Sequence, residues 1–200
     1  MRKLVTIFAV AAVVLVVSGL ANANLVNNGN GLIYDSDLNI TWYDATYAVD
    51  VPYVDGSQYD YWAPAMDWAA GLTVNGVNGW RLPAAVDGSM YNNTASEMGH
   101  LYYTELGNQG DGTIVSQNTG PFTNLLLGDE FEPALYWSGT EATDPHSAFA
   151  FSTTYGYQES NSKSNPGIYA MAVHAGNVPE PATMCLLGLG ALGLLKKRKA

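Results

Sequence analysis

Gly79-Trp80-Arg81-Leu82-Pro83 is the stretch from which we interpret the rest of the chain. Between residues 24 and 178 the only basic side chains are Arg81 and Lys163, set against seventeen Asp and Glu. An arginine that is alone among so many acids and flanked by two large apolar residues has little reason to serve as a solubilising charge. Its planar guanidinium suits carboxylates and backbone carbonyls. We therefore predict a structural Arg81, fixed by such partners at the edge of the core.

The N-terminal residues have the pattern of a secretory signal. Arg2 and Lys3 supply the positive start, residues 4–17 the apolar run, and Ala21-Asn22-Ala23 the small-x-small cleavage site. We predict that residues 1–23 are a signal peptide, so that the mature chain begins at Asn24. The alternative is an uncleaved membrane anchor.

Residues 24–178 are long enough for one domain with one core. Two basic and seventeen acidic side chains give this region a formal charge of −15. Such a charge argues against nucleic acid and anionic lipid as partners and is compatible with cations or neutral glycans. The only cysteine, Cys185, lies outside the region, which therefore has no disulfide, thiol nucleophile or cysteine metal site.

The C-terminal tail, residues 179–200, has three parts. Pro179-Glu180-Pro181 is followed by fourteen uncharged, mostly apolar residues (182–195) and then by a basic end. As a helix, the apolar part spans about 21 Å, short of the roughly 30 Å hydrocarbon core of a membrane. The basic end is expected to stay cytoplasmic, which leaves the domain outside.

These residues resemble the PEP-CTERM sorting tail: the Pro-Glu-Pro triplet, a short apolar helix rich in Gly and Leu, and a basic end. The resemblance implies a Gram-negative bacterium and recognition by an exosortase, a membrane protease, near Pro179, Glu180 and Pro181. It also implies a protein held transiently at the inner membrane on the periplasmic side, then released to the cell surface or an exopolysaccharide matrix. The alternative is a plain tail anchor.

Within the domain, the first predicted element is a β-hairpin. Residues 31–34 and 39–43 are strand-like, and the joining Asp35-Ser36-Asp37 predicts a turn stabilised by aspartate side chains. Pro64 fits the first turn of a helix that runs to about residue 70, with Gly71 as its stop.

A second helix is predicted from a capping box at Thr94-Ala95-Ser96-Glu97 to Gly107. Its inward side chains recur at helical spacing and are Met98, Leu101, Tyr102 and Leu106. His100, on the same helix, is predicted to be a partly exposed surface residue.

The final third supplies strands over residues 134–138, 147–152 and 168–174, with a turn over 161–167 between the last two. Phe149 and Phe151 are expected on one face of their strand, and Tyr169, Met171 and Val173 on one face of theirs. A hairpin, two helices and a run of strands predict an α+β fold with an antiparallel sheet. Trp42, Trp80 and Trp137 are assigned to its core.

Four groups of residues together resemble the DUF1566 family, also called the Lcl C-terminal domain family. They are Gly31-Leu32-Ile33-Tyr34-Asp35 with Thr41-Trp42, Trp80-Arg81-Leu82-Pro83 after Gly79, Tyr136-Trp137-Ser138-Gly139-Thr140, and Tyr169-Ala170-Met171-Ala172-Val173. The resemblance implies a compact fold akin to C-type lectins and formylglycine-generating enzymes, found on exported bacterial proteins. Some relatives bind sulfated glycosaminoglycans. The family's usual Thr after the Pro is Ala84 here, and Met171 and His174 stand where many relatives have Trp and Arg.

No residues form a catalytic or metal-binding pattern, and we predict a non-enzyme without a cofactor. His100, His146 and His174 share no metal-ligand spacing. A calcium-dependent lectin site wants a Glu-Pro-Asn-like triplet, and Glu132-Pro133-Ala134 lacks its last side-chain oxygen. Asp129, Glu130 and Glu132 form the one cluster to test for calcium. A solvated acidic turn is the interpretation we favour.

All five Trp and all thirteen Tyr lie within residues 24–178. Tyrosine rings in loops suit stacking on sugars, and the predicted platform consists of Tyr53, Tyr59, Tyr61, Tyr155 and Tyr157. We therefore expect an exported surface or matrix protein whose lectin-like domain binds extracellular polysaccharide or a surface protein. The alternatives are a structural matrix component without a defined ligand and a polysaccharide hydrolase.

Overall fold

A computed structural model of the protein describes residues 24–48, 53–54, 59–88, 90–110 and 117–180. The predicted signal peptide and the apolar C-terminal helix lie outside these residues. Among the helices of the described ranges, none is long and apolar enough to cross a membrane.

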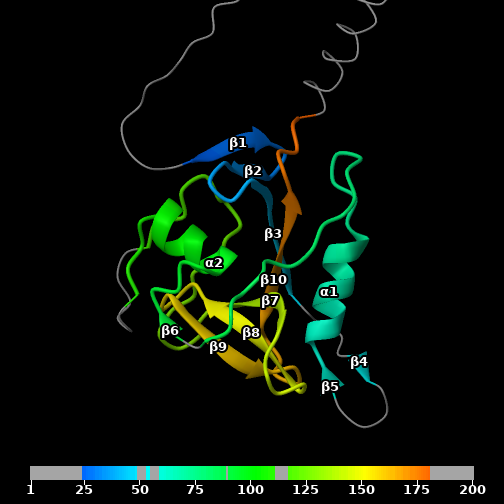
Figure 1. Cartoon of the computed structure of the whole chain (residues 1–200), viewed down its shortest axis with the longest axis vertical. Coiled ribbons are helices and arrows are strands. Elements are labelled where there is room, and N and C mark those ends of the chain that lie inside the picture. The colour runs from blue at the N-terminus through cyan, green and yellow to red at the C-terminus, as the bar shows by residue number, and fades with distance from the viewer. Residues whose placement is uncertain (1–23, 49–52, 55–58, 89, 111–116, 181–200) are drawn as a thin grey trace, which may run out of the picture.

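The fold is built on one eight-stranded sheet (Figure 1). In spatial order its strands are β1 (Leu25–Gly29), β2 (Leu32–Asp35), β3 (Ile40–Ala48), β10 (Tyr169–Ala175), β7 (Leu135–Glu141), β8 (Ser147–Ser152), β9 (Tyr157–Ser162) and β6 (Met90–Tyr91). A second, two-stranded sheet joins β4 (Tyr53–Val54) to β5 (Tyr59–Asp60). Of the pairs in the large sheet, β10 with β7 is parallel. The sheet is therefore mixed, and the prediction of an antiparallel sheet was wrong at its centre.

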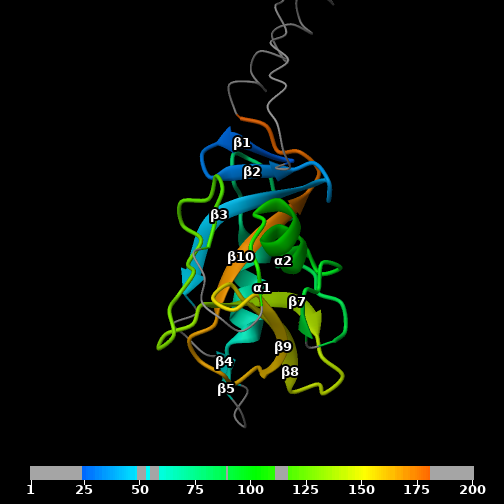
Figure 2. The same cartoon turned by 90° about the vertical axis from the view of Figure 1, so that its left-hand side faces the viewer.

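Helices lie on opposite sides of the sheet. Helix α1 (Trp62–Gly71) packs on one side, and on the other α2 (Glu97–Gly99) continues directly into the π-helix η1 (His100–Glu105) (Figures 1 and 2). Two hydrophobic cores result. One joins Met98 and Leu101 to Trp42, and the other joins Ala65 and Ala69 of α1 to Trp80 and Trp137.

Strand β10 shows why both cores form. Its alternate residues Met171 and Val173 enter the core below η1, as the sequence predicted for one face, and Ala170 and Ala172 enter the core below α1. Small residues on the second face let α1 approach closely. The three tryptophans assigned to the core are at most 2% exposed, which confirms that prediction.

The stretch Gly79–Pro83 fills a gap in the sheet. Strands β10 and β7 are paired at Tyr169 and Tyr136. Further along, Arg81 and Val173 exchange backbone hydrogen bonds of 3.0 and 2.8 Å, and Gly139 N–H donates to the Pro83 carbonyl (2.8 Å). Because this stretch is hydrogen-bonded to both strands, it closes the sheet where they separate.

Several predicted elements shift in the structure. Strands β1, β4, β5, β6 and β9 had not been predicted, and β9 takes up the first two residues of the turn expected over 161–167. The capping box was wrong: Ser96 is the N-cap, its Oγ accepts the Gly99 N–H (3.2 Å), and Glu97 is the first helical residue. Gly107 ends the helix with φ of 65°, as predicted.

Both ends of the described chain lie at the same end of the molecule, beside β1 and β2 (Figure 1). Asn28 Nδ2 donates to the carbonyl of Val178 (2.9 Å), and Val178 N–H donates to Thr41 Oγ1 (3.0 Å). These bonds fix the chain just before the predicted sorting triplet.

Candidate functional site

The first part of the site is the turn between β2 and β3. Asp35 is fully buried, and its Oδ1 accepts the backbone N–H groups of Asp37 (3.1 Å) and Leu38 (3.0 Å). Its Oδ2 faces Trp42 Nε1 at 3.4 Å. The predicted aspartate-stabilised turn is therefore present, with its principal carboxylate inside the protein.

The second part comes from η1. In an α-helix, side chains five residues apart point in directions about 140° apart. The i→i+5 hydrogen bonds of a π-helix widen the turn and bring such residues to one side, and Leu106 N–H to the Leu101 carbonyl (2.9 Å) is one such bond. His100 and Glu105 thus face each other, with Nε2 3.2 Å from Oε1.

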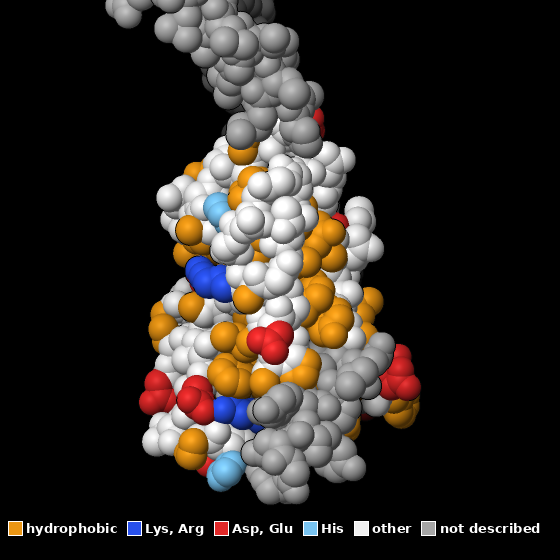
Figure 3. Space-filling view, turned by 90° about the vertical axis from the view of Figure 1, so that its right-hand side faces the viewer, with side chains coloured by type: hydrophobic (Ala, Val, Ile, Leu, Met, Phe, Trp, Pro, Cys, Tyr) orange, Lys and Arg blue, Asp and Glu red, His pale blue; other side chains and the backbone are white. Residues whose placement is uncertain are grey.

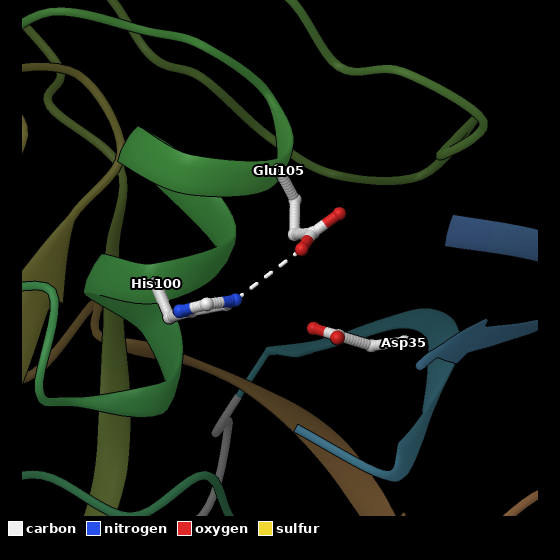
Figure 4. Close-up of side chains that lie close together, drawn as sticks. All are labelled: Asp35, His100 and Glu105. Atoms are coloured by element: carbon white, nitrogen blue, oxygen red, sulfur yellow. Dashed lines mark hydrogen bonds and ion pairs between the residues drawn. The ribbon is translucent and has the colours of Figure 1, made fainter. Parts of the chain in front are cut away.

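Figure 4 shows how Asp35, His100 and Glu105 converge from the turn and the π-helix. One ligand atom from each of the three lies within 4.8 Å of the others. The Glu105 side chain is 2% exposed and that of His100 is 16% exposed. The prediction of His100 as partly exposed is confirmed, and its contact with Glu105, close to the buried Asp35, had not been predicted.

Burial raises the pKa of Glu105, and the negative charges of Asp35 and Asp37 raise it further. Hydrogen bonds from the Asn24 N–H and from His100 act in the opposite direction. Two acids so close together compete for protons or for a positive partner. A cation placed here would meet a strong field.

A histidine and two carboxylates are ligand types suited to zinc or manganese. However, all four carboxylate oxygens already face a hydrogen-bond donor. Those of Asp35 face Asp37, Leu38 and Trp42, as above, and those of Glu105 face His100 and the backbone N–H of Asn24 (2.9 Å). A metal ion would have to displace some of these bonds.

A second candidate region surrounds the acidic loop between Gly128 and Pro133. Asp129 Oδ1 accepts the backbone N–H groups of Phe131 (2.8 Å) and Glu132 (2.9 Å), and these bonds lower the pKa of Asp129. A cavity of about 330 Å³ beside the loop is lined by Leu126, Gly128, Asp129, Glu132, Pro133, Ala134, Gly167 and Tyr169. Phe131, at the tip, is 89% exposed.

The tyrosines of the predicted platform lie in separate parts of the fold. Tyr155 and Tyr157 lie at the turn between β8 and β9, where the Tyr155 hydroxyl is 3.5 Å from the Glu130 carbonyl. Tyr61 donates its backbone N–H to Lys163, beyond the other end of β9. The backbone of Tyr53 and Tyr59 pairs β4 with β5, and their side chains lie outside the described part.

Two further aromatic residues form a pair that had not been singled out. Tyr47 and Trp68 stack with ring centroids 4.9 Å apart and planes at 7°, on the side of the sheet covered by α1. Figure 3 shows this side of the molecule, where hydrophobic side chains gather in patches. Both rings are half-buried.

Both basic residues of the domain are engaged. Arg81 contacts both oxygens of Glu97 at 2.7 Å and donates to the Leu82 carbonyl at 3.0 Å. Lys163 pairs with Glu141, and its Nζ lies 4.4 Å from the ring centroid of Trp62. The prediction that Arg81 is held by a carboxylate and a carbonyl is confirmed.

The predicted sorting triplet begins on the folded domain. Pro179 is half-buried, and the exposed Glu180 lies against Gly29, where a Cβ would come 2.3 Å from Glu180 Oε1. Gly29 has φ of 77°, a conformation that also favours glycine. Pro181 lies outside the described residues.

Residues 177–199 match the family described as the PEP-CTERM protein-sorting motif. The motif suggests an exported protein that is sorted at the membrane of a Gram-negative bacterium with an exosortase as its partner. No curated protein and no solved structure matches the chain.

Proposed function

We propose that the chain is a non-enzymatic protein of the cell surface or exopolysaccharide matrix, sorted by an exosortase and carrying a domain that binds extracellular polysaccharide. The observation that carries the proposal is the sorting motif, which begins at residue 177, two residues beyond the last residue of β10. The domain is therefore joined to the sorting signal through one of the central strands of its sheet. Before processing it is held at the inner membrane on the periplasmic side.

The proposal includes a lectin-like fold related to the DUF1566 family. The residues of the resemblance support it because they lie on neighbouring parts of the same sheet. Trp42 lies on β3, Trp137 on β7, and residues 79–83 fill the gap between β10 and β7. A family motif that closes the sheet has a structural reason to stay together.

The binding surface that we propose is the acidic loop with its cavity. Phe131 exposes an apolar ring at the tip of the loop. The hydroxyl of Tyr155 lies 3.5 Å from the carbonyl of Glu130, which belongs to the same loop. Flat rings next to a polar groove suit stacking on sugar rings. The charge of −15 over residues 24–178 favours a neutral polysaccharide over a sulfated one.

A non-enzymatic role is supported by the burial of the acidic cluster formed by Asp35 and Glu105 with His100. Asp35 is 0% exposed, so a polysaccharide chain does not reach its carboxylate. A glycosidase needs two carboxylates on either side of an accessible sugar bond. The cluster therefore acts within the protein rather than on a polymer.

The test is a pull-down of the mature chain, residues 24–200 in mild detergent, with exopolysaccharide from the producing organism. We expect retention that a calcium chelator leaves unchanged. Phe131→Ser and Tyr155→Ser should each weaken retention, because they remove the apolar rings of the proposed surface. Val26→Ser is the matched control, since Val26 is 52% exposed on β1, away from the loop.

If the chelator abolished retention, the binding would be explained by a calcium site at Asp129, Glu130 and Glu132 and not by the aromatic rings. No retention at all would overturn polysaccharide binding. In that case, loss of matrix cohesion on deletion of the gene would support a structural matrix component instead. Shortened glycan products would show a hydrolase.

A further inference from the structure

Asn24 is the residue that follows the predicted cleavage site, and its backbone N–H, its carbonyl and its side-chain nitrogen are all hydrogen-bonded. Its backbone N–H donates to Glu105 Oε2 (2.9 Å), and its side-chain amide donates to Asp37 Oδ1 (2.5 Å). Its carbonyl accepts the Ser36 N–H (3.0 Å). The first residue of the predicted mature chain therefore has a defined position against the acidic cluster.

The surroundings of the Asn24 nitrogen are rich in negative charge. Asp35 and Glu105 are buried, Asp37 bonds the Asn24 side chain, and His100 is the one basic side chain that contacts this cluster in the described part of the chain. In the precursor the Asn24 nitrogen is a neutral amide, and it offers one proton to these acids. Burial and like charges already disfavour the ionised form of Glu105.

We propose that removal of the signal peptide converts the Asn24 nitrogen into an α-ammonium that forms an ion pair with Glu105, so that export completes the folded domain. This inference rests on the proposed export and on cleavage after Ala23. Water hydrolyses the Ala23–Asn24 peptide bond: its hydroxyl adds to the Ala23 carbonyl carbon, and one hydrogen is transferred to the Asn24 nitrogen. The free amine then takes a proton from solution, because an α-amino group has a pKa of about 7.7–8.0.

The geometry suits an ammonium better than an amide. A charged donor makes a shorter and stronger hydrogen bond to a carboxylate than a neutral one, and the nitrogen is already at hydrogen-bonding distance. A cavity of about 240 Å³ lined by Asn24, Asp37, Thr104 and Glu105 gives room for water to accept the remaining N–H protons. The ammonium also reduces the repulsion between Asp35 and Glu105.

The π-helix brings Glu105 and His100 to the same side of the helix, where Glu105 also meets Asn24. Glu105 is the last residue of η1, and regular α-helical geometry would turn it away from His100. The fold therefore holds a buried acid, at the end of a π-helix, against the first residue of the predicted mature chain. It assigns to Glu105 the role of a receptor for the new N-terminus.

The test uses the chain of residues 24–200 in mild detergent, released from a removable fusion so that Asn24 carries a free amine. The pH dependence of its acylation, followed by mass spectrometry, gives the pKa of the α-amine. We expect a value about one unit above that of an exposed terminus, and therefore about tenfold slower acylation near pH 7. Glu105→Gln should restore ordinary reactivity. Asp67→Asn, which removes an exposed charge on α1, should not.

Thermal unfolding provides a second readout. Acetylation of Asn24, or retention of Ala23, should lower the melting temperature of the wild-type chain by several degrees. Both changes should have little effect in the Glu105→Gln variant, because the partner charge is gone. Equal acylation rates and equal acetylation effects in wild type and Glu105→Gln would overturn the ion pair.

Two further measurements separate the alternatives. A melting temperature that rises with zinc or manganese and falls with chelator would overturn the ammonium in favour of a metal ion. N-terminal sequencing of the exported protein should begin at Asn24. A different first residue would overturn the inference and leave the proposed export standing, whereas loss of polysaccharide retention alone would overturn the proposed binding and leave the ion pair intact.

Discussion

The guanidinium of Arg81 meets the carboxylate of Glu97 through two hydrogen bonds of 2.7 Å each. The pairing joins the stretch that closes the sheet to the first residue of α2. Glu97 Oε2 also accepts the backbone N–H of Ala84 (2.7 Å). The one carboxylate of Glu97 therefore fixes two positions of the segment that follows Trp80, namely Arg81 and Ala84.

Arg81→Ala should destabilise the protein by about 1–2 kcal/mol, because the Arg81 side chain is 43% exposed and solvent screens the pair. Arg81→Lys should recover less than half of this loss, since an ammonium cannot make the paired contacts of a guanidinium. Urea unfolding of both variants, and of each combined with Glu97→Gln, measures the coupling. An unchanged unfolding midpoint for Arg81→Ala would show that the pair contributes nothing.

Asp44→Asn should destabilise the protein by about 2 kcal/mol, because hydrogen bonds to a buried charge are among the strong ones. The Asp44 carboxylate is 5% exposed and accepts bonds from Thr123 N–H (2.7 Å), Thr123 Oγ1 (2.8 Å) and Asn124 N–H (3.0 Å). An amide keeps one acceptor oxygen and turns a donor toward these groups. Chemical unfolding measures the loss. The exposed Asp67→Asn should stay within about 0.5 kcal/mol of wild type, and equal effects at the two positions would contradict the prediction.

Gly99→Ala should destabilise the protein by about 3 kcal/mol or more, because the added methyl overlaps fixed backbone. A Cβ on Gly99 would lie 1.9 Å from the Asn93 carbonyl oxygen. Gly71→Ala, at the last residue of α1 with no atom within 4 Å of the new Cβ, is the control. It should be neutral or stabilise by up to about 1 kcal/mol. Similar melting temperatures for the two variants would refute the packing argument.

Glu105 should make the uncleaved chain more stable as the pH falls toward 4.5, the ordinary pKa of a glutamate. Its pKa is raised in the folded state, so its stabilising protonation is complete below the ordinary value of 4.5 and is lost as the pH rises through the folded pKa. In the mature chain the proposed ammonium favours the ionised carboxylate and should flatten this slope. Glu105→Gln should remove it.

Asp129 and Asp144 should change the stability of the protein in the opposite direction to Glu105, and at lower pH. Both have lowered pKa values because backbone N–H groups donate to their carboxylates. Their contribution is present above the ordinary value of 3.8 and is lost as the pH falls through the folded pKa. Melting temperatures measured above about pH 5 therefore separate the effect of Glu105 from that of these two aspartates. A slope that survives Glu105→Gln would assign the effect to another group.

Parts of the fold with a clear hydrophobic period could be predicted from the sequence. Alternation places Met171 and Val173 on one face of β10, and helical spacing places Met98 and Leu101 inside. Strand β9 has no such period, because its residues are polar and Gln158 is the one that is buried. It is a strand because β8 pairs with it along its whole length.

The acidic cluster could not be predicted for a related reason. At α-helical spacing His100 and Glu105 do not share a side, and the sequence contains no signal for a π-helix. Asp35 was predicted to stabilise a turn, and it does so through Asp37 and Leu38. Its burial beside Glu105 depends on how β2 and η1 pack, which no local pattern records.

The arrangement of the two chain ends has a mechanical consequence. Because both ends of the described chain lie at the same end of the molecule, a domain held by its tail is loaded at that end alone, and flow cannot stretch it between its termini. Any pull on the tail enters through β10, which is hydrogen-bonded to β3 along most of its length. Strands loaded along their axes share force across many bonds at once. A pull on the tail would therefore be resisted by the hydrogen bonds between β10 and β3 acting together.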